Sequence, residues 1–424
     1  MGKIPAKKLE IFKVVKEKNY EQEILENLHP KFTNFSGQVQ TAEWLIITII
    51  FLANFLGPFS GNMILPMFNV LKLEFNVEVF MLGLSVAVFM VPFSITQLFS
   101  GVLSDLFYGR KNIIVGGSIL SCLGFLLAAF SPTIWIFLVA RVIQGIGAAF
   151  IAPIAMAMVG DFFSKEIRGK IMGGVAVSTT LGATLGPLIG GFFANFDWRL
   201  GFIALALATA LTTLFAFIVI PSNQKQPVIG RSGEALKILW EVLTRKEVLG
   251  VGLLGFILFF IRISVYTYLS DILTLKPYNL PSHIIGGLLA LAGFGGLVAG
   301  LISGYLTDKI GRRKTAILGF LMVLIVLCFY LTVGWYMILP FLLFAMGFSI
   351  TTAFTPINTM AVEVYPKYRA ATTSIYGSMR FLGYALGPIL AYPLYVVGLI
   401  GGIATLSIGA TIFGLLLLLK LKPT

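Results

Sequence analysis

GVLSDLFYGRK, the stretch from Gly101 to Lys111, recurs later in the chain as GYLTDKIGRRK, from Gly304 to Lys314. Both copies end an apolar run, contain an aspartate, and close with a glycine followed by basic residues. The aspartates Asp105 and Asp308 are 203 residues apart, close to half of the 424-residue chain. The recurrence predicts an internal duplication in which each half of the chain makes the same turn between two helices.

The composition predicts that this duplicated chain lies in a membrane. Hydrophobic residues make up 58% of it and charged residues 12%, and the mean hydropathy is +0.94, far from the values of soluble domains. A helix needs about 20 apolar residues to cross a hydrocarbon core roughly 30 Å thick, so the chain has room for a dozen spans. Because lipid offers the backbone no hydrogen-bonding partner, the expected fold class is an all-α membrane protein.

Twelve apolar runs are long enough to span a membrane. They form two groups of six, and a polar tail and a polar linker make up the other two parts of the chain. We expect a cytoplasmic tail over 1–43, a six-helix bundle over 44–220, a cytoplasmic linker over 221–246 and a second six-helix bundle over 247–420. The predicted spans are Trp44–Leu71, Val79–Leu103, Asn112–Phe130, Thr133–Val159, Ile167–Ala194, Trp198–Ile220, Val248–Leu275, Ile284–Leu306, Thr315–Leu331, Trp335–Val362, Ala370–Leu394 and Val396–Leu419.

The basic residues give the predicted orientation. They collect in the tail, the linker and the loops after the second, fourth, eighth and tenth spans, while the loops on the opposite side contain only Lys72, Arg199 and Lys276. Because short cytoplasmic loops accumulate Lys and Arg, both termini are expected in the cytoplasm and the protein in the plasma membrane. This topology also accounts for the net charge of +13, so we expect no nucleic-acid partner.

Cysteine and histidine usage indicates neither a metal site nor a cofactor. Cys122 and Cys328 lie in apolar runs, and His29 and His283 are isolated. The sequence shows no nucleophile paired with a base and no phosphate-binding loop, so enzymatic activity is not expected. The tail lacks the apolar segment of a signal peptide, and it forms either an amphipathic helix on the membrane surface or a solvated helix.

The repeated turns resemble the signature that follows the second helix in the major facilitator superfamily. The second copy fits this signature throughout, whereas the first has one extra residue between Asp105 and Gly109 and lacks the basic residue that often follows the aspartate. The resemblance implies twelve helices in two pseudo-symmetric bundles that transport by alternating access. Glycines allow a tight turn there, and an aspartate near basic residues can form charge-assisted hydrogen bonds that hold one conformation.

Charged residues also recur after the fourth and tenth spans, where the stretch from Asp161 to Arg168 is echoed by that from Glu363 to Arg369. Together with the repeated turns they predict paired charges at a cytoplasmic gate. The predicted gating residues are Gly101, Asp105, Gly109, Arg110, Asp161, Arg168, Gly304, Asp308, Gly311, Arg312, Arg313, Glu363 and Arg369.

The fourth span contains Arg141-Val-Ile-Gln144-Gly145, which is similar to the Arg-x-x-Gln-Gly motif of proton-coupled family members. The resemblance implies a role for Arg141 in proton coupling. A buried arginine is costly in lipid and should face a cavity or a partner. The alternative is a structural role in which Arg141 bonds to neighbouring backbone carbonyls.

The fifth span resembles that of the twelve-helix drug:proton antiporters, which implies multidrug efflux rather than import. Glycines four residues apart lie on one helix face and permit close contact, and a proline bends the helix. The residues that match the antiporter pattern are Gly173, Gly182, Gly186, Pro187, Gly190 and Gly191.

The charges within the spans depart from the antiporter pattern. Related exporters often carry an acid late in the first helix, where this chain has asparagines such as Asn54, and Asp271 lies near the outer boundary of the seventh span. Buried cations need an anion or many dipoles, so we expect Arg262 or Arg380 to contact an anionic or zwitterionic substrate. The alternative is that Asn54, Asn62, Asn358, Tyr266 and water satisfy them. The predicted substrate-binding and coupling residues are Asn62, Arg141, Arg262, Tyr266, Asp271, Asn358 and Arg380.

Three functions therefore compete. The first is a secondary transporter that exports small amphipathic molecules or metabolites in exchange for protons. The second is a carrier or exchanger of organic anions that uses the buried arginines, and the third is a membrane receptor or scaffold without transport activity. For the first, the expected partners are a small-molecule substrate, protons as coupling ion and the lipid bilayer, and the protein is expected to be a monomer.

Overall fold

The computed structural model describes residues 36–103, 109–221, 232–332 and 334–421. The chain falls into two compact units, Met1–Thr48 and Ile49–Thr424. In the first unit the described residues are the opening turns of a helix that begins at Ser36, where the Thr48 hydroxyl donates to the carbonyl oxygen of Trp44 (2.8 Å). The predicted tail helix before Ser36 lies outside the described residues. The packing below is that of the second unit.

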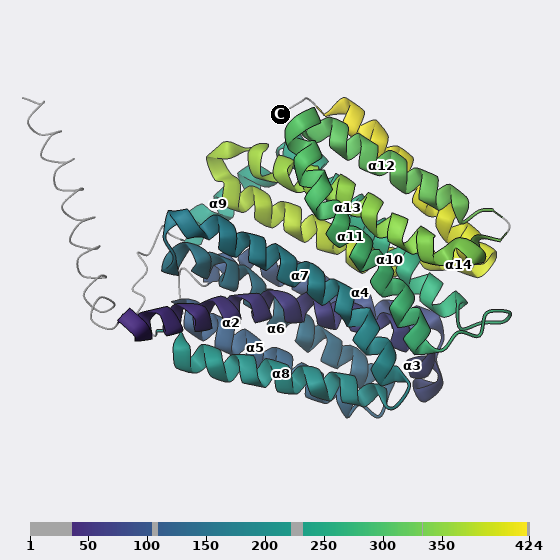
Figure 1. Cartoon of the computed structure of the whole chain (residues 1–424), viewed down its shortest axis with the longest axis horizontal. Coiled ribbons are helices and arrows are strands. Elements are labelled where there is room, and N and C mark those ends of the chain that lie inside the picture. Colours follow the sequence, from purple (N-terminus) through teal and green to yellow (C-terminus); the bar gives the residue numbers. More distant parts are fainter. Residues whose placement is uncertain (1–35, 104–108, 222–231, 333, 422–424) are drawn as a thin grey trace, which may run out of the picture. The chain divides into compact units, whose positions relative to one another are not determined.

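The described residues fold into helices and contain no strand, which confirms the all-α fold class (Figure 1). The first half of the chain forms α2 (Ser36–Met63), η2 (Leu65–Met67), α3 (Phe68–Phe75), α4 (Val79–Leu103), α5 (Gly109–Ala129), α6 (Ile134–Phe162), α7 (Lys165–Ala194) and α8 (Trp198–Val219). A short helix, α9 (Ser232–Leu243), belongs to the linker. The second half forms α10 (Lys246–Ile272), α11 (Ser282–Ile310), α12 (Arg312–Phe329), η4 (Trp335–Ile338), α13 (Leu339–Glu363), η5 (Pro366–Tyr368) and α14 (Arg369–Lys420).

Ten helical segments of the described chain are long and apolar enough to cross a membrane, and two features reconcile this number with the twelve predicted spans. Helix α14 has 52 residues and a non-helical kink at Leu399. At 1.5 Å per residue the helical rise on the two sides of the kink sums to about 78 Å, more than twice the thickness of a hydrocarbon core, so the segment holds the last two predicted spans. Helix α12 is the remaining span; its 18 residues begin with Arg312, Arg313 and Lys314, which lower its apolar content.

Two helix pairs join the halves. Helix α4 packs against the first part of α14, and α7 packs against α11. Within each half, α5 packs on α6 and α8, and α10 packs on α14 (Figure 1). We call the end of the bundle that carries α9 and the start of α5 the linker end, and the end that carries α3 and the loop from α10 to α11 the far end. The surfaces between the halves run from one end to the other.

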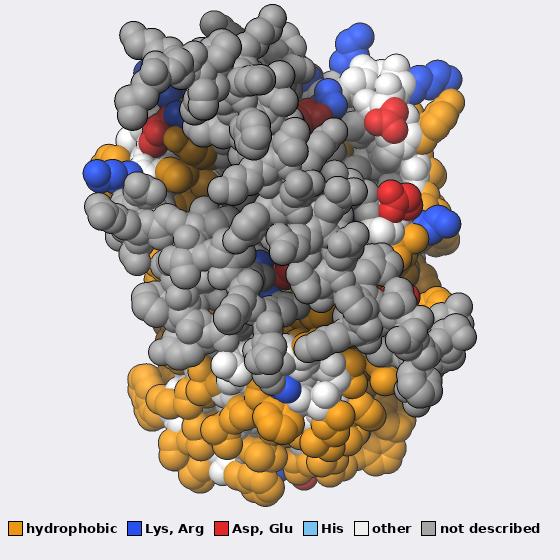
Figure 2. All heavy atoms as spheres, turned by 90° about the vertical axis from the view of Figure 1, so that its left-hand side faces the viewer, with side chains coloured by type: hydrophobic (Ala, Val, Ile, Leu, Met, Phe, Trp, Pro, Cys, Tyr) orange, Lys and Arg blue, Asp and Glu red, His pale blue; other side chains and the backbone are white. Residues whose placement is uncertain are grey.

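Figure 2 looks onto the side of the molecule where α9 lies. Among the described residues there, hydrophobic side chains gather in the lower part, while most of the visible Lys, Arg, Asp and Glu side chains lie in the upper part. Charged side chains at the helix ends are expected of a protein that spans a bilayer.

Candidate functional site

Three glycines of α7 lie directly against the backbone of α2. A Cβ atom on Gly182, Gly186 or Gly190 would stand 2.1–2.5 Å from a carbonyl oxygen of α2. These separations are too short for any side chain, so only glycine allows the two helices to approach this closely. The four-residue spacing puts all three on one face of the helix.

The other residues of the helix-five motif have different surroundings. A Cβ on Gly191 would lie 2.4 Å from the Ser282 carbonyl oxygen in the second half, and one on Gly286 of α11 would lie 2.3 Å from the Pro187 carbonyl oxygen. Around Gly173, in contrast, no described atom lies within 4 Å of the Cβ position. The motif therefore combines a packing face towards α2 with a contact between the halves, and Gly173 belongs to neither.

Aromatic rings surround Arg380 near the middle of the first part of α14. Its guanidinium carbon lies 4.5 Å from the ring centre of Phe381 and 5.0 Å and 5.3 Å from those of Phe259 and Phe354. The rings attract the cation through their quadrupoles. The Nε atom is buried and has no hydrogen-bond partner among the described residues.

The rings around Arg380 also connect the two halves. Phe381 meets Phe93 of α4 edge to face, with ring centres 4.8 Å apart. Phe259 lies 6.3 Å from the ring of Tyr384, whose hydroxyl donates to Asn62 Oδ1 of α2 (3.3 Å). We call the set the central cluster; its members are Phe93, Phe259, Phe354, Tyr376, Arg380, Phe381 and Tyr384.

The other residues considered for binding differ in exposure and in contacts. Arg262 is half-buried, and its guanidinium carbon lies 5.6 Å from the ring centre of the buried Tyr266. Asn54 and Asn62 use their Nδ2 atoms to donate to carbonyl oxygens one turn earlier in α2. Asn358 is exposed on α13. The Oδ1 atom of Asn62, which could accept from an arginine, accepts from Tyr384 instead.

Arg141 is fully buried and is held by neighbouring groups of its own half. It donates to Gln144 Oε1 (2.7 Å) and to the Ser85 carbonyl oxygen (3.3 Å), and it lies 4.3 Å from the ring centre of Phe89. Gln144 in turn donates to the Gly124 carbonyl oxygen (2.9 Å). One terminal nitrogen of Arg141 has no partner among the described residues. The contact with a carbonyl oxygen matches the structural alternative predicted for Arg141.

In the described residues every carboxylate lies at or near a helix end or in a loop, and none lies in the middle of a span. The most buried is Asp271, which is 2% exposed at the far end of α10. Its Oδ1 atom lies 2.7 Å from Lys72 Nζ of α3, and its Oδ2 atom accepts a hydrogen bond from Tyr395 (2.5 Å). Asp271 is thus part of a contact between the halves at the far end, away from the central cluster.

The linker end carries matching ion pairs in the two halves. Arg110 Nε lies 2.9 Å from Asp161 Oδ2, and an Arg312 terminal nitrogen lies 2.5 Å from Glu363 Oε1. In both pairs the two residues are 51 positions apart in the sequence. The structure therefore brings together two pairs of the predicted gating charges, one in each half, and each pair joins helices of the same half.

The remaining predicted gating residues differ in their contacts. Arg168 donates to the carbonyl oxygens of Phe163 (2.9 Å) and Gly160 (2.6 Å) at the end of α6, and Arg313 donates to that of Leu419 (2.6 Å). Such bonds satisfy the free carbonyl groups at helix ends. Asp308 and Arg369 are exposed, Gly304 has open space at its Cβ position, and Gly311 has a φ of 92° that favours glycine. Gly101 and Gly109 lie at helix ends, and Asp105 lies outside the described residues.

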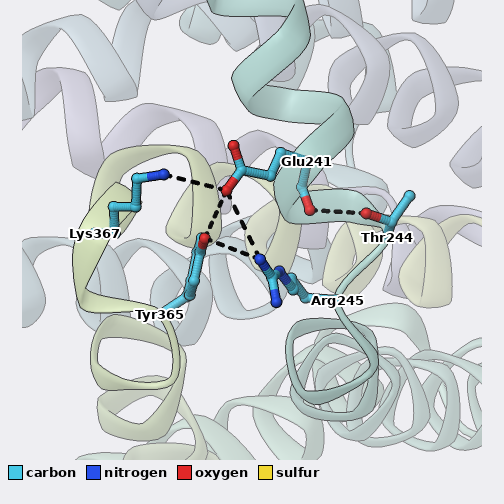
Figure 3. Close-up of polar contacts among 5 residues, drawn as sticks. All are labelled: Glu241, Thr244, Arg245, Tyr365 and Lys367. Carbon is cyan, nitrogen blue, oxygen red and sulfur yellow. Dashed lines mark hydrogen bonds and ion pairs between the residues drawn. The ribbon is translucent and has the colours of Figure 1, made fainter.

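Helix α9 contacts the second half through a set of polar side chains that was not predicted from the sequence (Figure 3). Glu241 accepts a hydrogen bond from the Tyr365 hydroxyl (2.7 Å) and lies 3.4 Å from Lys367 Nζ and 3.8 Å from an Arg245 nitrogen. The hydrogen bond from Tyr365 and the two cations lower the pKa of Glu241, and the same bond raises the pKa of Tyr365. Beneath these residues Val242 packs in an apolar cluster with Val248 and Ile375.

A family model described as Major Facilitator Superfamily matches residues 50–281 and 272–424. The chain is 28% identical over 348 residues to the bacillibactin exporter of Bacillus subtilis, covering 78% of this chain and 84% of that protein. It is 27% identical to multidrug resistance protein 2 of the same organism, covering 67% and 76% of the two chains. With a bicyclomycin resistance protein homolog of Haemophilus influenzae the identity is 25%, covering 83% and 90%.

Among solved structures, the human organic anion transporter MFSD10 superposes with a TM-score of 0.68. The alignment covers 89% of this chain and 99% of that one at 20% sequence identity. At this identity the similarity establishes the shared fold.

Proposed function

Because the chain belongs to the major facilitator superfamily and is a multi-pass membrane transporter, we propose that it exports small amphipathic molecules, with a preference for those that carry a negative charge. The observation that carries this proposal is the central cluster. It offers the half-buried cation of Arg380 among aromatic rings of the second half, one of which, Phe381, meets Phe93 of the first half. Arg262 supplies a second cation beside Tyr266.

The chemistry of the cluster suits an amphipathic anion. A carboxylate or sulfonate would form charge-assisted hydrogen bonds with a guanidinium, and its apolar part would stack on the rings. Carboxylates of the described chain lie away from the cluster, so no side-chain anion there competes for the arginines. Ligand sites of this kind are commonly apolar surfaces with a few polar groups that fix orientation.

The contacts between the halves support alternating access. Lys72 and Asp271 join the halves at the far end, and Ser94 and Ser378 exchange hydrogen bonds (2.8 Å and 2.9 Å) between α4 and α14. A rocking motion of one half against the other around the cluster would break one set of contacts and form another. The domain boundaries proposed from the sequence, with bundles over 44–220 and 247–420, place the moving parts on either side of the linker.

The proposed orientation in the membrane is based on the positions of the basic loops. We assign the linker end and both termini to the cytoplasm of a plasma-membrane protein that acts as a monomer. The similarity to an exporter and to resistance proteins supports outward transport.

We propose two ways in which transport is driven, first proton antiport and second exchange of organic anions. Proton antiport is favoured by the motif around Arg141 and Gln144. Exchange of organic anions is favoured by the three span arginines and by the lack of a carboxylate in the middle of any described span, since proton antiport ordinarily needs a group that titrates within the cavity.

Proteoliposomes separate these couplings. The purified protein is reconstituted, and uptake of a panel of fluorescent amphipathic anions is measured first under a pH gradient and then with only a preloaded anion gradient. Accumulation driven by the pH gradient supports proton antiport, and exchange that ignores the pH gradient supports the second coupling. A protein that moves no member of a broad panel in either experiment contradicts the proposed transport function.

A further inference from the structure

The contact surface between α7 and α11, which we call the seam, joins the two halves of the protein. We propose that the part of the seam nearer the linker end closes in the second conformation of the transport cycle. In that conformation Val177 packs against Gly300, and Gly173 lies against Gly304. The inference rests on the proposed alternating access and adds to it the residues that meet when the linker end closes.

The part of the seam nearer the far end is already closed. A Cβ on Gly286 of α11 would lie 3.2 Å from the Cα of Gly191 on α7, and one on Gly293 would lie 2.3 Å from Thr184 Oγ1. From the first of these pairs to the second, the residue number rises by seven on α11 and falls by seven on α7. The two helices are therefore antiparallel and share one register.

This register predicts which residues face each other further along the seam. Seven residues beyond the contact of Gly293 are Gly300 on α11 and Val177 on α7. Four residues further, Gly304 is opposite Gly173. Steps of seven and four residues return to nearly the same face of a helix. These residues therefore lie on the faces through which α7 and α11 touch nearer the far end.

The residues that the register pairs nearer the linker end are apart in the structure. No described atom of another helix lies within 4 Å of the Cβ position of Gly173, Gly300 or Gly304. Val177 is 52% exposed. The seam is thus closed near the far end and open near the linker end.

The other surface between the halves, formed by α4 and α14, has contacts at both levels. Near the far end, a Cβ on Gly83 would lie 3.1 Å from the Cβ of Pro388. Nearer the linker end, Ser94 and Ser378 exchange hydrogen bonds. The opening is therefore a feature of α7 and α11, and not a general separation of the two halves.

The open part of the seam has the same shape of residues as the closed part. Val177 has the branched shape of Thr184, and Gly300 leaves the same free space as Gly293, against which Thr184 packs. Small residues at an interface allow two helices in a membrane to approach closely. Closure would bury the exposed side chain of Val177, and it gives Gly173 of the helix-five motif the contact that it lacks in this conformation.

The test measures crosslinking across the open part of the seam in nanodiscs. Cys122→Ser and Cys328→Ser remove the native thiols. Cysteines are then introduced at two exposed positions near the linker ends of the helices, Lys170 on α7 and Lys309 on α11. A short bismaleimide traps the closed conformation irreversibly, even when few molecules are closed at one time. We expect this parent protein to crosslink.

Variants of the seam identify the contacts. Gly304→Leu and Gly300→Val fill the space that closure needs, so each should slow crosslinking about tenfold. Both should keep the thermal unfolding midpoint of the parent, because these Cβ positions are open in the described conformation. Gly300→Val combined with Val177→Gly exchanges the side chain and the space and should recover most of the rate. Gly287→Leu is the matched control, since its Cβ position on α11 is also open but lies on another face.

The proposal is overturned if the parent does not crosslink, or if it crosslinks at the same rate as Gly304→Leu and Gly300→Val. An equal slowing by Gly287→Leu would also overturn it. Failure of the exchange variant to recover the rate would contradict the pairing of Val177 with Gly300. A protein that crosslinks as expected but moves no substrate would support the contact and contradict the proposed transport function.

Discussion

Lys72 and Asp271 form an ion pair that joins the two halves of the transporter at the far end, with Nζ and Oδ1 2.7 Å apart. The carboxylate is 2% exposed and also accepts a hydrogen bond from Tyr395. A buried charge that loses its partner is strongly destabilising. The pair therefore favours the conformation in which the halves meet at this end.

Asp271→Asn should shift the protein towards a conformation that is open at the far end. We expect about a tenfold change in the ratio of the open to the closed conformation, equivalent to ~1.4 kcal/mol. Breaking a fully buried pair costs ~3–5 kcal/mol. The expected effect is smaller because the Lys72 side chain is 24% exposed. Spin labels at the exposed positions Phe196 and Met337 would report the opening as a longer distance in pulsed electron resonance. Lys72→Gln should act in the same direction, and the double variant should add little to either change. Unaltered distances in both single variants would rule out this role for the pair.

Gly190→Ala should destabilise the protein, whereas Gly173→Ala should not. The new Cβ on residue 190 would stand 2.1 Å from the Met63 carbonyl oxygen, while the Cβ position of residue 173 is open. Overpacking typically costs ~1–3 kcal/mol, and alanine is a better helix former than glycine by ~1 kcal/mol. Thermal unfolding of the purified proteins in detergent should show a lower midpoint for the first variant and an equal or higher one for the second. Equal midpoints for the two would show that the close approach of α7 to α2 is not required.

Gln144→Ala should lower stability through Arg141. The variant removes the 2.7 Å hydrogen bond that Arg141 donates and also leaves the Gly124 carbonyl oxygen without the Gln144 donor. Hydrogen bonds to charged groups contribute ~1.5–3 kcal/mol, so the loss should reach that size in denaturant unfolding. Gln144→Glu, which restores an acceptor for Arg141, should recover part of it. A Gln144→Ala protein as stable as the native one would show that Arg141 is satisfied without this partner.

Acid should release α9 from the second half. The hydrogen bond from Tyr365 lowers the pKa of Glu241 below its ordinary value, so the ionised carboxylate stabilises the docked helix above that ordinary value. This stabilisation is lost as the pH falls through the lowered pKa. A spin label at Lys237, which is exposed on α9, should become more mobile in that acidic range.

Two variants identify the group that controls this release. Tyr365→Phe removes the donor and should move the transition to higher pH, towards the ordinary pKa of a glutamate. Thr244→Val is the matched control, because the Thr244 hydroxyl donates to the backbone oxygen of Glu241 and not to its carboxylate (Figure 3). A transition at the same pH in Tyr365→Phe and in the native protein would exclude the Tyr365 contact as its cause.

The sequence was sufficient to predict the fold because its strongest signals are local. Apolar run length determines where a helix can span a membrane, and the repeated turns at Asp105 and Asp308 revealed the duplication. The boundary between the last two spans was also predicted closely. It was placed between Leu394 and Val396, and the non-helical residue Leu399 interrupts α14 nearby.

The centre of the protein could be predicted only in part. Arg262 and Arg380 could be identified because a charge within a span is rare. The rings around Arg380 could not be identified, since 37 phenylalanines are spread along the chain. Which of them meet depends on how each helix is rotated. The pairing of Lys72 with Asp271 was hidden for a related reason: the residues are 199 positions apart and belong to different halves. Contacts of that kind depend on tertiary packing, and no local pattern encodes them.

The most direct test of the central claim is a charge-selective transport measurement. Proteoliposomes with native protein, Arg262→Gln or Arg380→Gln take up an amphipathic fluorescent carboxylate and its neutral methyl ester in parallel, and Lys276→Gln, in an exposed far-end loop, serves as the control. Loss of a hydrogen-bonded charge contact of ~1.5–3 kcal/mol predicts roughly a tenfold or larger loss of carboxylate transport in at least one arginine variant, with ester transport retained. Equal transport of the carboxylate by the native protein and both arginine variants would contradict the account.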